Sequence, residues 1–298
     1  MISVLVDGGK RPGEMIDENT LRQFVKIRKP YHHDRLPFIV FWSHKSGCTA
    51  IFKWFLFHAG LLDEANGYIP NNKGSVRSIH KYENQIFKSR PNYTPELITK
   101  LRTGSPIVCF VRCPFERTFS SYMHLNNPIF LTNPKWPSPE GQARREVIEA
   151  AYGQGRPITH PISFWDFLEW LKNRDLEAVD IHLRPQYGPL FDSFQIAFYR
   201  LEELSLVIPH LENYYSMRSS RDVLDEILAS SHHMDKGFAS KSETLDLLSE
   251  GVELRTKGPR FVPRVSREML EGTRFGEVIT QIYGLDIELF DRISKTSH

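Results

Sequence analysis

One short polar segment of the chain combines residue types that bind an anion. Lys45 supplies a positive charge, Ser46 and Thr49 supply hydroxyl groups, and Gly47 has no Cβ to keep a ligand away from the backbone. The apolar run Phe38–Trp42 comes before this segment, and apolar residues at helical spacing come after it, which predicts a strand, a loop and a helix. Because the N-terminus of a helix attracts negative charge, we expect a phosphate to bind at this loop.

The loop does not have the order of a nucleoside triphosphate loop. That eight-residue pattern needs a glycine five residues before its Gly-Lys-Ser/Thr, and Val40 and Phe41 occupy this region here. Lys45 also precedes Gly47 instead of following it. Taken alone, the segment has a second interpretation as a solvated turn between a strand and a helix.

A second strand also ends at a basic residue. The apolar run Pro106–Val111 predicts a buried parallel strand, and Arg112 follows it directly at the edge of the sheet where ligands bind in α/β proteins. Arg112 is suited to a charge-assisted fork with a second phosphate, and Ser120 lies two helical turns later, where it can point to the same group. The alternative is a structural ion pair between Arg112 and Glu116.

These motifs require a parallel sheet with helices around it. The chain has 298 residues, 40% of them hydrophobic and 25% charged, which fits one large α/β domain. We predict a three-layer fold of the P-loop type, with a central parallel sheet flanked by helices, over residues 36–298. Residues 1–35 are expected to form an irregular N-terminal arm with a short strand at Ile2–Val6. Helices are predicted at residues 51–59, 95–101, 140–152, 164–172 and 202–230, and a further strand at 195–199.

Composition narrows the classes of function. The net charge of +2 gives no strong field for nucleic acid, and no stretch has the length of a membrane span. The N-terminus lacks the pattern of a signal peptide, and three cysteines form no disulfide framework, so we expect a cytoplasmic protein. No group of Cys or His residues has ligand spacing along the sequence, so no metal is expected.

The two basic motifs together resemble the cofactor signatures of a known family. Lys45-Ser46-Gly47-Cys48-Thr49 and Arg112–Tyr122 are similar to the two signatures of the PAPS-dependent sulfotransferases, in the branch of the Golgi carbohydrate and heparan sulfotransferases. Similar segments follow in the same order at Ser163–Leu168, His182–Gln186, Phe198–Leu204 and Ile282–Phe290. The resemblance covers roughly residues 36–292.

The resemblance implies roles for individual residues. The loop Lys45–Thr49 would hold the 5′-phosphosulfate of PAPS, and Arg112 with Ser120 would hold its 3′-phosphate. Lys45 would also stabilise the leaving phosphate. His80 is similar to the histidine taken as the base in the heparan 2-O branch, with His182 and His124 in reserve. The basic loop with Lys257, Gly258 and Arg260 is similar to a late phosphate clamp of soluble members.

Some positions depart from the family pattern. His44 replaces a proline that usually precedes the lysine, and Cys113 stands where an acidic residue is common. Ala50 lies where many soluble members place a tryptophan against the adenine, and Tyr199 matches a tyrosine near that base or is simply a core aromatic residue. Adenine stacking is therefore left open.

The resemblance implies in-line transfer of a sulfuryl group from PAPS to a hydroxyl or an amine of a saccharide or small metabolite, with PAP as the product. Two alternatives stay open. A P-loop kinase-like phosphotransferase would use the same strand-loop-helix edge but would need magnesium ligands. A nucleotide-binding protein without catalysis would keep Lys45 and Arg112 and would need no base. The sequence does not indicate the acceptor or the oligomeric state.

Overall fold

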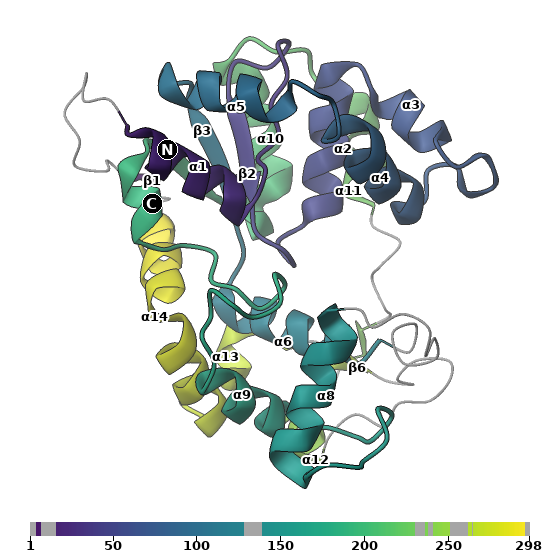
Figure 1. Cartoon of the computed structure of the whole chain (residues 1–298), viewed down its shortest axis with the longest axis vertical. Helices are drawn as coiled ribbons and strands as arrows, with labels where there is room; N and C mark the ends of the chain where they lie inside the picture. The colour runs from purple at the N-terminus through teal and green to yellow at the C-terminus, as the bar shows by residue number, and fades with distance from the viewer. Residues whose placement is uncertain are drawn as a thin grey trace. The chain divides into compact units, whose positions relative to one another are not determined.

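The structure is a computed structural model of the chain, and it describes residues 4–6, 16–127, 139–229, 236–237, 241–250, 262–263 and 265–295. The chain divides into two compact units (Figure 1). Unit 1 contains residues 1–111, 186–232 and 289–298, and unit 2 contains residues 112–185 and 233–288. Each unit is described by itself below.

Unit 1 is built on a four-stranded sheet in the order β1-β4-β3-β2. The strands are β1 (Val4–Val6), β2 (Ile39–Trp42), β3 (Ile107–Val111) and β4 (Ile196–Arg200). The strands β2, β3 and β4 are parallel, and β1 pairs antiparallel to β4. Every residue of β2 and β3 is buried, as their continuous apolar runs predict.

Helices and short helical turns surround this sheet. The helices are α1 (Glu18–Ile27), α2 (Cys48–Ala59), α3 (Leu62–Gly67), α4 (Val76–Tyr82), α5 (Tyr93–Arg102), α10 (Leu204–Tyr214) and α11 (Leu224–Leu228). The turns are η1 (Pro70–Asn72), η2 (Glu83–Phe87), η3 (Pro189–Ser193), η4 (Leu201–Glu203) and η5 (Arg221–Val223). The last helix of the chain, α14 (Arg274–Lys295), contributes residues to both units.

Both faces of the sheet are covered by helices. Trp42 and Phe110 are register partners and share one face, on which the Phe110 ring lies 6.1 Å from the ring of Trp54 in α2. Phe41 points to the other face, where its ring lies 5.0 Å from that of Phe24 in α1. The sheet therefore lies between two helical layers, and the predicted class, a three-layer α/β fold with a parallel sheet, is confirmed.

The N-terminal region differs from its prediction. Residues 18–27 were expected in an irregular arm, but they form α1, which buries Leu21, Phe24 and Val25. The Asp17 side chain accepts a hydrogen bond from the backbone amide of Thr20 and so caps this helix. The helical spacing of the apolar residues in this segment explains why it folds as a helix.

Unit 2 is mainly helical in its described part. Its helices are α6 (Pro114–Leu125), α8 (Pro139–Tyr152), α9 (Phe164–Lys172), α12 (Lys241–Glu250), α13 (Arg267–Leu270) and most of α14, and β5 (Lys236–Gly237) pairs with β6 (Val262–Pro263). Tyr122 of α6 packs on Phe164 and Phe167 of α9. Ser163 and Asp166 form a reciprocal capping box, which explains why α9 begins where the sequence predicts.

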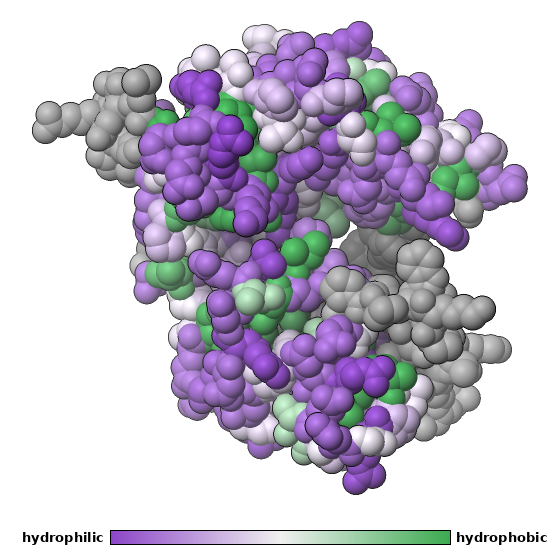
Figure 2. Space-filling view, in the orientation of Figure 1, coloured by the Kyte–Doolittle hydropathy of each residue, from purple (hydrophilic) through white to green (hydrophobic). Residues whose placement is uncertain are grey.

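The described surface is mainly polar, as expected if the apolar residues lie inside the two units. On the face shown in Figure 2, the described residues are mainly hydrophilic, and apolar residues form small scattered groups. Among the helices of the described residues, none combines the length and the apolar character required to cross a lipid bilayer.

Candidate functional site

The loop between β2 and α2 has a backbone shape that favours an anion. Lys45 has φ 64° and Gly47 has φ 71°, so two residues of this short loop are left-handed. Gly47 is the N-cap of α2, and no described side chain caps this helix end. The first amides of α2, from Cys48 onward, thus lie at a helix N-terminus directly after a lysine, which is a suitable environment for a phosphate.

Gly47 is required for two reasons. Its positive φ is costly for a residue with a Cβ, and a Cβ placed there would lie 2.3 Å from Cδ1 of Leu201. Leu201 begins the turn η4 that follows β4. The packing of the Leu201 side chain against this loop therefore depends on the glycine.

A buried polar network holds the loop from inside. The hydroxyls of Ser43 and Ser46 lie 2.6 Å apart, and both approach Oε1 of Gln186, at 2.9 Å and 2.7 Å. All three residues are almost fully buried. The side chain of Ser46, expected among the phosphate ligands, thus points into the protein, so its hydroxyl positions the loop. Gln186 was not predicted as a site residue, although it belongs to the segment His182–Gln186.

His80 lies beside this loop. Its Nε2 is 3.1 Å from the hydroxyl of Thr49, and its Nδ1 is 2.9 Å from Oε2 of Glu83. The histidine is in α4, and Glu83 begins η2, a π-helical turn that continues α4. Turns of this kind occur often at functional sites. A carboxylate on Nδ1 fixes the ring and leaves Nε2 as the nitrogen directed to the loop.

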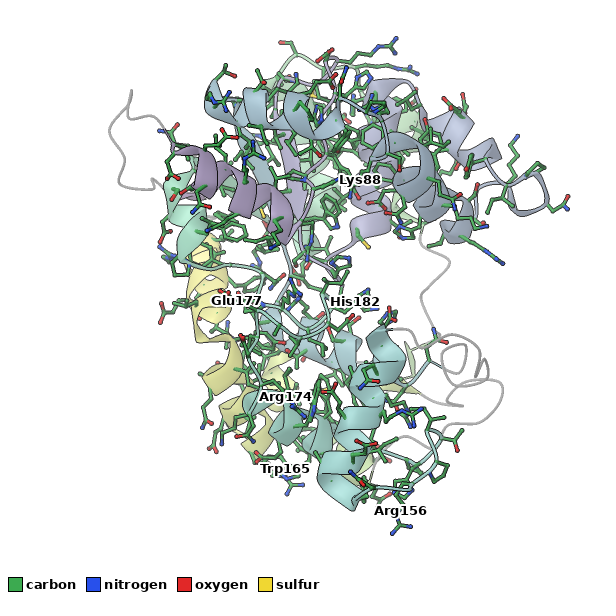
Figure 3. All side chains as sticks on the ribbon, in the orientation of Figure 1. Lys88, Arg156, Trp165, Arg174, Glu177 and His182 are labelled. Carbon is green, nitrogen blue, oxygen red and sulfur yellow. The ribbon has the colours of Figure 1, made fainter. Side chains whose placement is uncertain are left out.

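Glu83 is itself held by several donors. Its Oε1 accepts hydrogen bonds from the Tyr31 hydroxyl at 2.8 Å and from Nζ of Lys88 at 2.7 Å. Nζ of Lys88, which is labelled in Figure 3, also lies 4.4 Å from the centre of the Trp42 ring. The Glu83 side chain is 7% exposed, and each of its two oxygens has a hydrogen-bond partner. Sequence reasoning missed Glu83, although its place three residues after His80 on a helix was a usable signal.

The network shifts the pKa values of its members. Burial lowers the pKa of His80, but hydrogen bonds to Cys48 and Glu83 outweigh it and raise this pKa to about 10. Burial raises the pKa of Glu83, but the hydrogen bond from His80 and the charge of Lys88 lower it to about 2. For the Cys48 thiol, burial again opposes the charged form, but the hydrogen bond to His80 lowers its pKa. Folding thus favours a charged imidazole next to the loop.

Tyr199, the candidate near the adenine, and Ala50, which lies where many soluble members place a tryptophan, are both buried. Tyr199 in β4 is 5% exposed, and its ring lies 6.1 Å from that of Phe110. Ala50, in the first turn of α2, is 8% exposed. Tyr199 therefore has the environment of a core aromatic residue, and its role at the adenine stays a prediction.

The second predicted motif lies in unit 2. Nη2 of Arg112 lies 3.3 Å from Oε2 of Glu116, the ion pair that was the alternative to a phosphate contact. Glu116, Ser120 and His124 follow at intervals of four residues and are partly exposed, while the helix residues between them are buried. We call Arg112, Glu116, Ser120 and His124 the α6 stripe. Arg112 and Ser120 therefore share one accessible side of this segment, as the predicted spacing requires.

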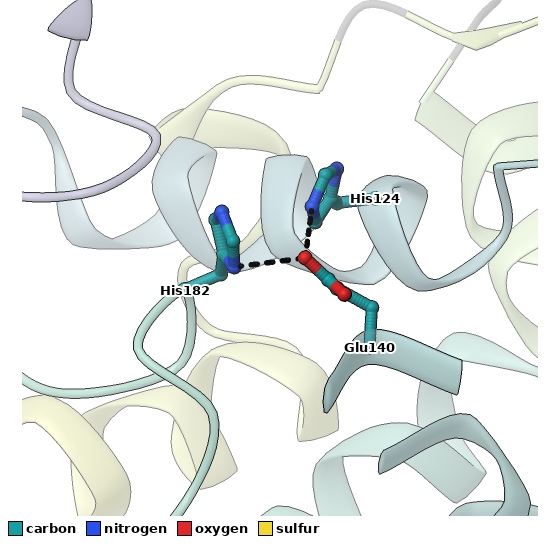
Figure 4. A group of neighbouring side chains, drawn as sticks. All are labelled: His124, Glu140 and His182. Carbon is teal, nitrogen blue, oxygen red and sulfur yellow. Dashed lines mark ion pairs between the residues drawn. The ribbon is translucent and has the colours of Figure 1, made fainter. Parts of the chain in front are cut away.

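The α6 stripe ends at a group of two histidines and one carboxylate. Nε2 of His124 is 3.5 Å from Oε1 of Glu140, and Nδ1 of His182 is 3.8 Å from the same oxygen (Figure 4). Nδ1 of His182 is also 2.7 Å from Oδ1 of Asp180. His124 and His182, which were both reserve candidates for the base, thus lie together in unit 2, whereas His80 lies in unit 1.

The remaining predicted ligands are outside the described residues. Lys257, Gly258 and Arg260, compared with a late phosphate clamp, belong to this part of the chain. The segment Lys45–Ala50, His80 and Tyr199 belong to unit 1, where His80 contacts Thr49, and Arg112 and Ser120 belong to unit 2.

Comparison with known proteins gives one match. A family model described as the sulfotransferase family matches residues 34–291, which is most of the chain. No curated protein and no solved structure gives a significant match. The matched range contains the loop after β2, the segment around His80 and the α6 stripe.

Proposed function

Because the chain belongs to the sulfotransferase family, we propose that it transfers a sulfuryl group from PAPS to a hydroxyl or an amine of a saccharide or small metabolite. The observation that carries this proposal is the loop of unit 1. In this loop Lys45 and Gly47 have left-handed conformations, and the helix that follows has no side-chain cap among the described residues. The imidazole of His80 lies beside the loop, 3.1 Å from the Thr49 hydroxyl. These groups have the charge and the donor atoms that a phosphosulfate requires.

The loop residues stabilise negative charge during the transfer. PAPS supplies an activated sulfuryl group and a phosphate leaving group, so the protein must orient the acceptor and stabilise the charge that develops on the leaving oxygen. The amides of Cys48, Thr49 and Ala50 are suited to phosphate oxygens. Lys45 is suited to the oxygen between sulfur and phosphorus, because a charged ammonium there is most valuable as the bond breaks.

His80 is the proposed base. The acceptor oxygen forms a bond to sulfur as the bond from sulfur to the phosphate oxygen breaks, and the acceptor proton moves to Nε2 of His80. Glu83 supports this role, since it holds Nδ1 at 2.9 Å and stabilises the imidazolium that forms. Because the pKa of His80 is raised, we expect the rate to increase with pH above the usual range for histidine.

Arg112 and Ser120 are proposed to bind the 3′-phosphate. Their place on the accessible side of the α6 stripe supports this assignment, and the ion pair to Glu116 would then exchange for a phosphate. The ion pair is long, at 3.3 Å, and joins partly exposed groups, so it costs little to replace.

The proposal is tested with labelled PAPS and ligand-induced stabilisation of the full chain. Adenosine 3′,5′-bisphosphate should raise the melting temperature much more than AMP or ATP. Lys45→Ala should lower turnover more than affinity, and Lys81→Ala, an exposed lysine next to His80, is the matched control. Equal stabilisation by ATP and the bisphosphate, or no transfer of label in a broad acceptor screen, would exclude the proposed activity.

A further inference from the structure

We propose that His124, Glu140 and His182 form a binding site for a divalent transition metal, with Zn²⁺ as the ion best suited to them. One donor atom from each residue lies within 4.8 Å of the other two. The residues come from three segments of unit 2: the last turn of α6, the first turn of α8, and the loop before Leu183. The proposed function assigns no role to these three residues, and His182 enters it only as the alternative candidate for the base.

The distances in the group fit coordination better than hydrogen bonding. The imidazole nitrogens lie 3.5 Å and 3.8 Å from the same oxygen of Glu140, which is longer than a good hydrogen bond. Two ligand atoms bound to Zn²⁺ at about 2.0–2.1 Å in a tetrahedral arrangement lie about 3.3–3.4 Å apart. Each imidazole nitrogen must therefore move about 0.1–0.5 Å closer to the Glu140 oxygen, and the two nitrogens, which lie within 4.8 Å of each other, must reach the same separation. Two histidines and one carboxylate are also a donor set common to zinc and other first-row metals.

The three segments are held in place by contacts outside the group. The Ser121 hydroxyl of α6 donates to the His182 carbonyl at 2.8 Å, which ties the loop to the helix that carries His124. Arg144, one turn after Glu140 in α8, is fully buried and donates to Oδ1 of Asn126 at 2.7 Å and to the carbonyl of Ile158 at 2.7 Å. The backbone of each ligand is therefore fixed before an ion arrives, which reduces the entropy cost of binding.

Asp180 gives the group a second carboxylate. Its Oδ1 is 2.7 Å from Nδ1 and 2.9 Å from the backbone nitrogen of His182. Metal binding at Nδ1 therefore requires the Nδ1 proton to move to Nε2 or to solvent, and it leaves Asp180 as a negative neighbour of the ion. Asp180 therefore competes with the ion for Nδ1, because a carboxylate that supports a ligand histidine accepts a hydrogen bond from the other ring nitrogen.

The group is mostly buried. The side chains of His124, Glu140 and His182 are 18%, 15% and 17% exposed, and Nε2 of His124 is buried. Three protein ligands leave one position of a tetrahedral Zn²⁺ ion to be filled by water or by an oxygen of a bound molecule. We therefore expect a mostly buried ion with one such additional ligand.

The sequence prediction of no metal was based on ligand spacing along the chain. His124, Glu140 and His182 are separated by 16 and 42 residues, so no short ligand motif exists. Only the packing of α6, α8 and the loop brings them together. The spacing of ligand residues along the sequence could therefore neither reveal nor exclude this site.

The experiment measures metal binding to the full chain after treatment with a chelator. Titration with Zn²⁺ followed by calorimetry, and with Co²⁺ followed by visible absorption, should give one ion per chain. His124→Ala and Glu140→Gln should each weaken binding by at least about 100-fold. His160→Ala is the matched control, because this histidine is in the same unit and outside the group, and it should bind the ion like the original chain.

Two outcomes would overturn the proposal. One is no binding of Zn²⁺ or Co²⁺ at micromolar concentrations, and the other is an ion whose affinity is unchanged in both His124→Ala and Glu140→Gln. Circular dichroism of each variant shows whether it folds. Glu140→Gln keeps the shape of the side chain at a partly exposed helix start, so its result remains informative if His124→Ala does not fold.

Discussion

The loop of unit 1 and the α6 stripe of unit 2 are both candidates for binding phosphate, but they are built differently. The loop has a shape fixed by its backbone and by the buried contacts of Ser46 with Gln186. His80 beside it is held by the buried carboxylate of Glu83. In the α6 stripe, Ser120 is partly exposed on α6, and Arg112, just before this helix, is partly exposed and pairs with the partly exposed Glu116.

The comparison suggests a division of roles. A rigid environment lowers the cost of reorganisation when charge develops, so it suits the group where bonds change. Exposed side chains that exchange one partner for another contribute to affinity and much less to the chemical step. We therefore expect changes around the loop to affect turnover and stability, and changes in the α6 stripe to affect binding.

The largest effect is expected for His80→Ala. Loss of the base should lower turnover by roughly 10²–10⁴, while adenosine 3′,5′-bisphosphate binds within a few-fold of its original affinity. Single-turnover measurements with labelled PAPS separate the two quantities. His210→Ala, in the same unit but on α10, is the control and should leave turnover unchanged.

A different result would move the base to unit 2. If His80→Ala retained nearly normal turnover while His182→Ala lost it, the base would be His182. The division of roles between loop and stripe would then be wrong, although sulfuryl transfer itself would still be supported.

The second prediction concerns Arg112→Ala. Removing a charged fork from a phosphate site should cost about 2–4 kcal/mol, which is about 30- to 1000-fold in affinity for the bisphosphate. Turnover at saturating PAPS should change much less. Arg145→Ala, an exposed arginine of α8, is the control in the same unit. Unchanged affinity in Arg112→Ala would show that Glu116 is the true partner of this arginine.

The sequence predicted local structure better than long-range contacts. The runs before Lys45 and Arg112 predicted β2 and β3, and the bounds of α9 were predicted correctly because its capping box is local. The prediction of an irregular arm before residue 36 was wrong at α1, where the apolar residues have helical spacing. At both candidate sites, the sequence pattern identified the charged residues but not the residues that position them.

The missed partners share a physical reason. Gln186 is 140 residues from Ser46, and Glu140 is 42 residues from His182, so neither pair has a signal in the local sequence. Glu83 is the exception, since it lies three residues after His80. Local spacing can predict a helical neighbour of this kind, whereas contacts between segments appear only when the fold is known.

The third prediction tests how firmly the loop is fixed. Gly47→Ala should lower the free energy of unfolding by about 1–3 kcal/mol, because it adds strain at φ 71° and a Cβ close to Leu201. Gly74→Ala is a matched control, since Gly74 has φ 70° and a Cβ added there would meet no atom within 4 Å. The control should show the backbone strain alone. Urea denaturation measures the free energy of unfolding of both variants. The cost of Gly47→Ala should be smaller in a Leu201→Ala background, because the side chain that the new Cβ meets is then absent.

The smallest effect is the pH dependence of stability that His80 confers. The pKa of His80 is raised from 6.5 to about 10 in the folded chain, so folding favours its protonated form. This stabilisation is fully present below pH 6.5 and is lost as the pH rises towards 10. The ring is 35% exposed, so solvent screening reduces the effect, and we expect a loss of about 1 kcal/mol between about pH 6.5 and 9.

Urea denaturation at several pH values tests this expectation. The stability difference between the original chain and His80→Ala should shrink as the pH rises, because only the original chain has the charged imidazole to lose. Cys48→Ser should keep part of this pH dependence, since Glu83 still stabilises the imidazolium at Nδ1 when the thiol is gone. A difference that stays constant or grows with pH would mean that His80 is neutral in the folded chain. The Glu83 carboxylate would then orient the ring without holding its charge, and the acidic limb of the rate profile should return to the usual range of histidine.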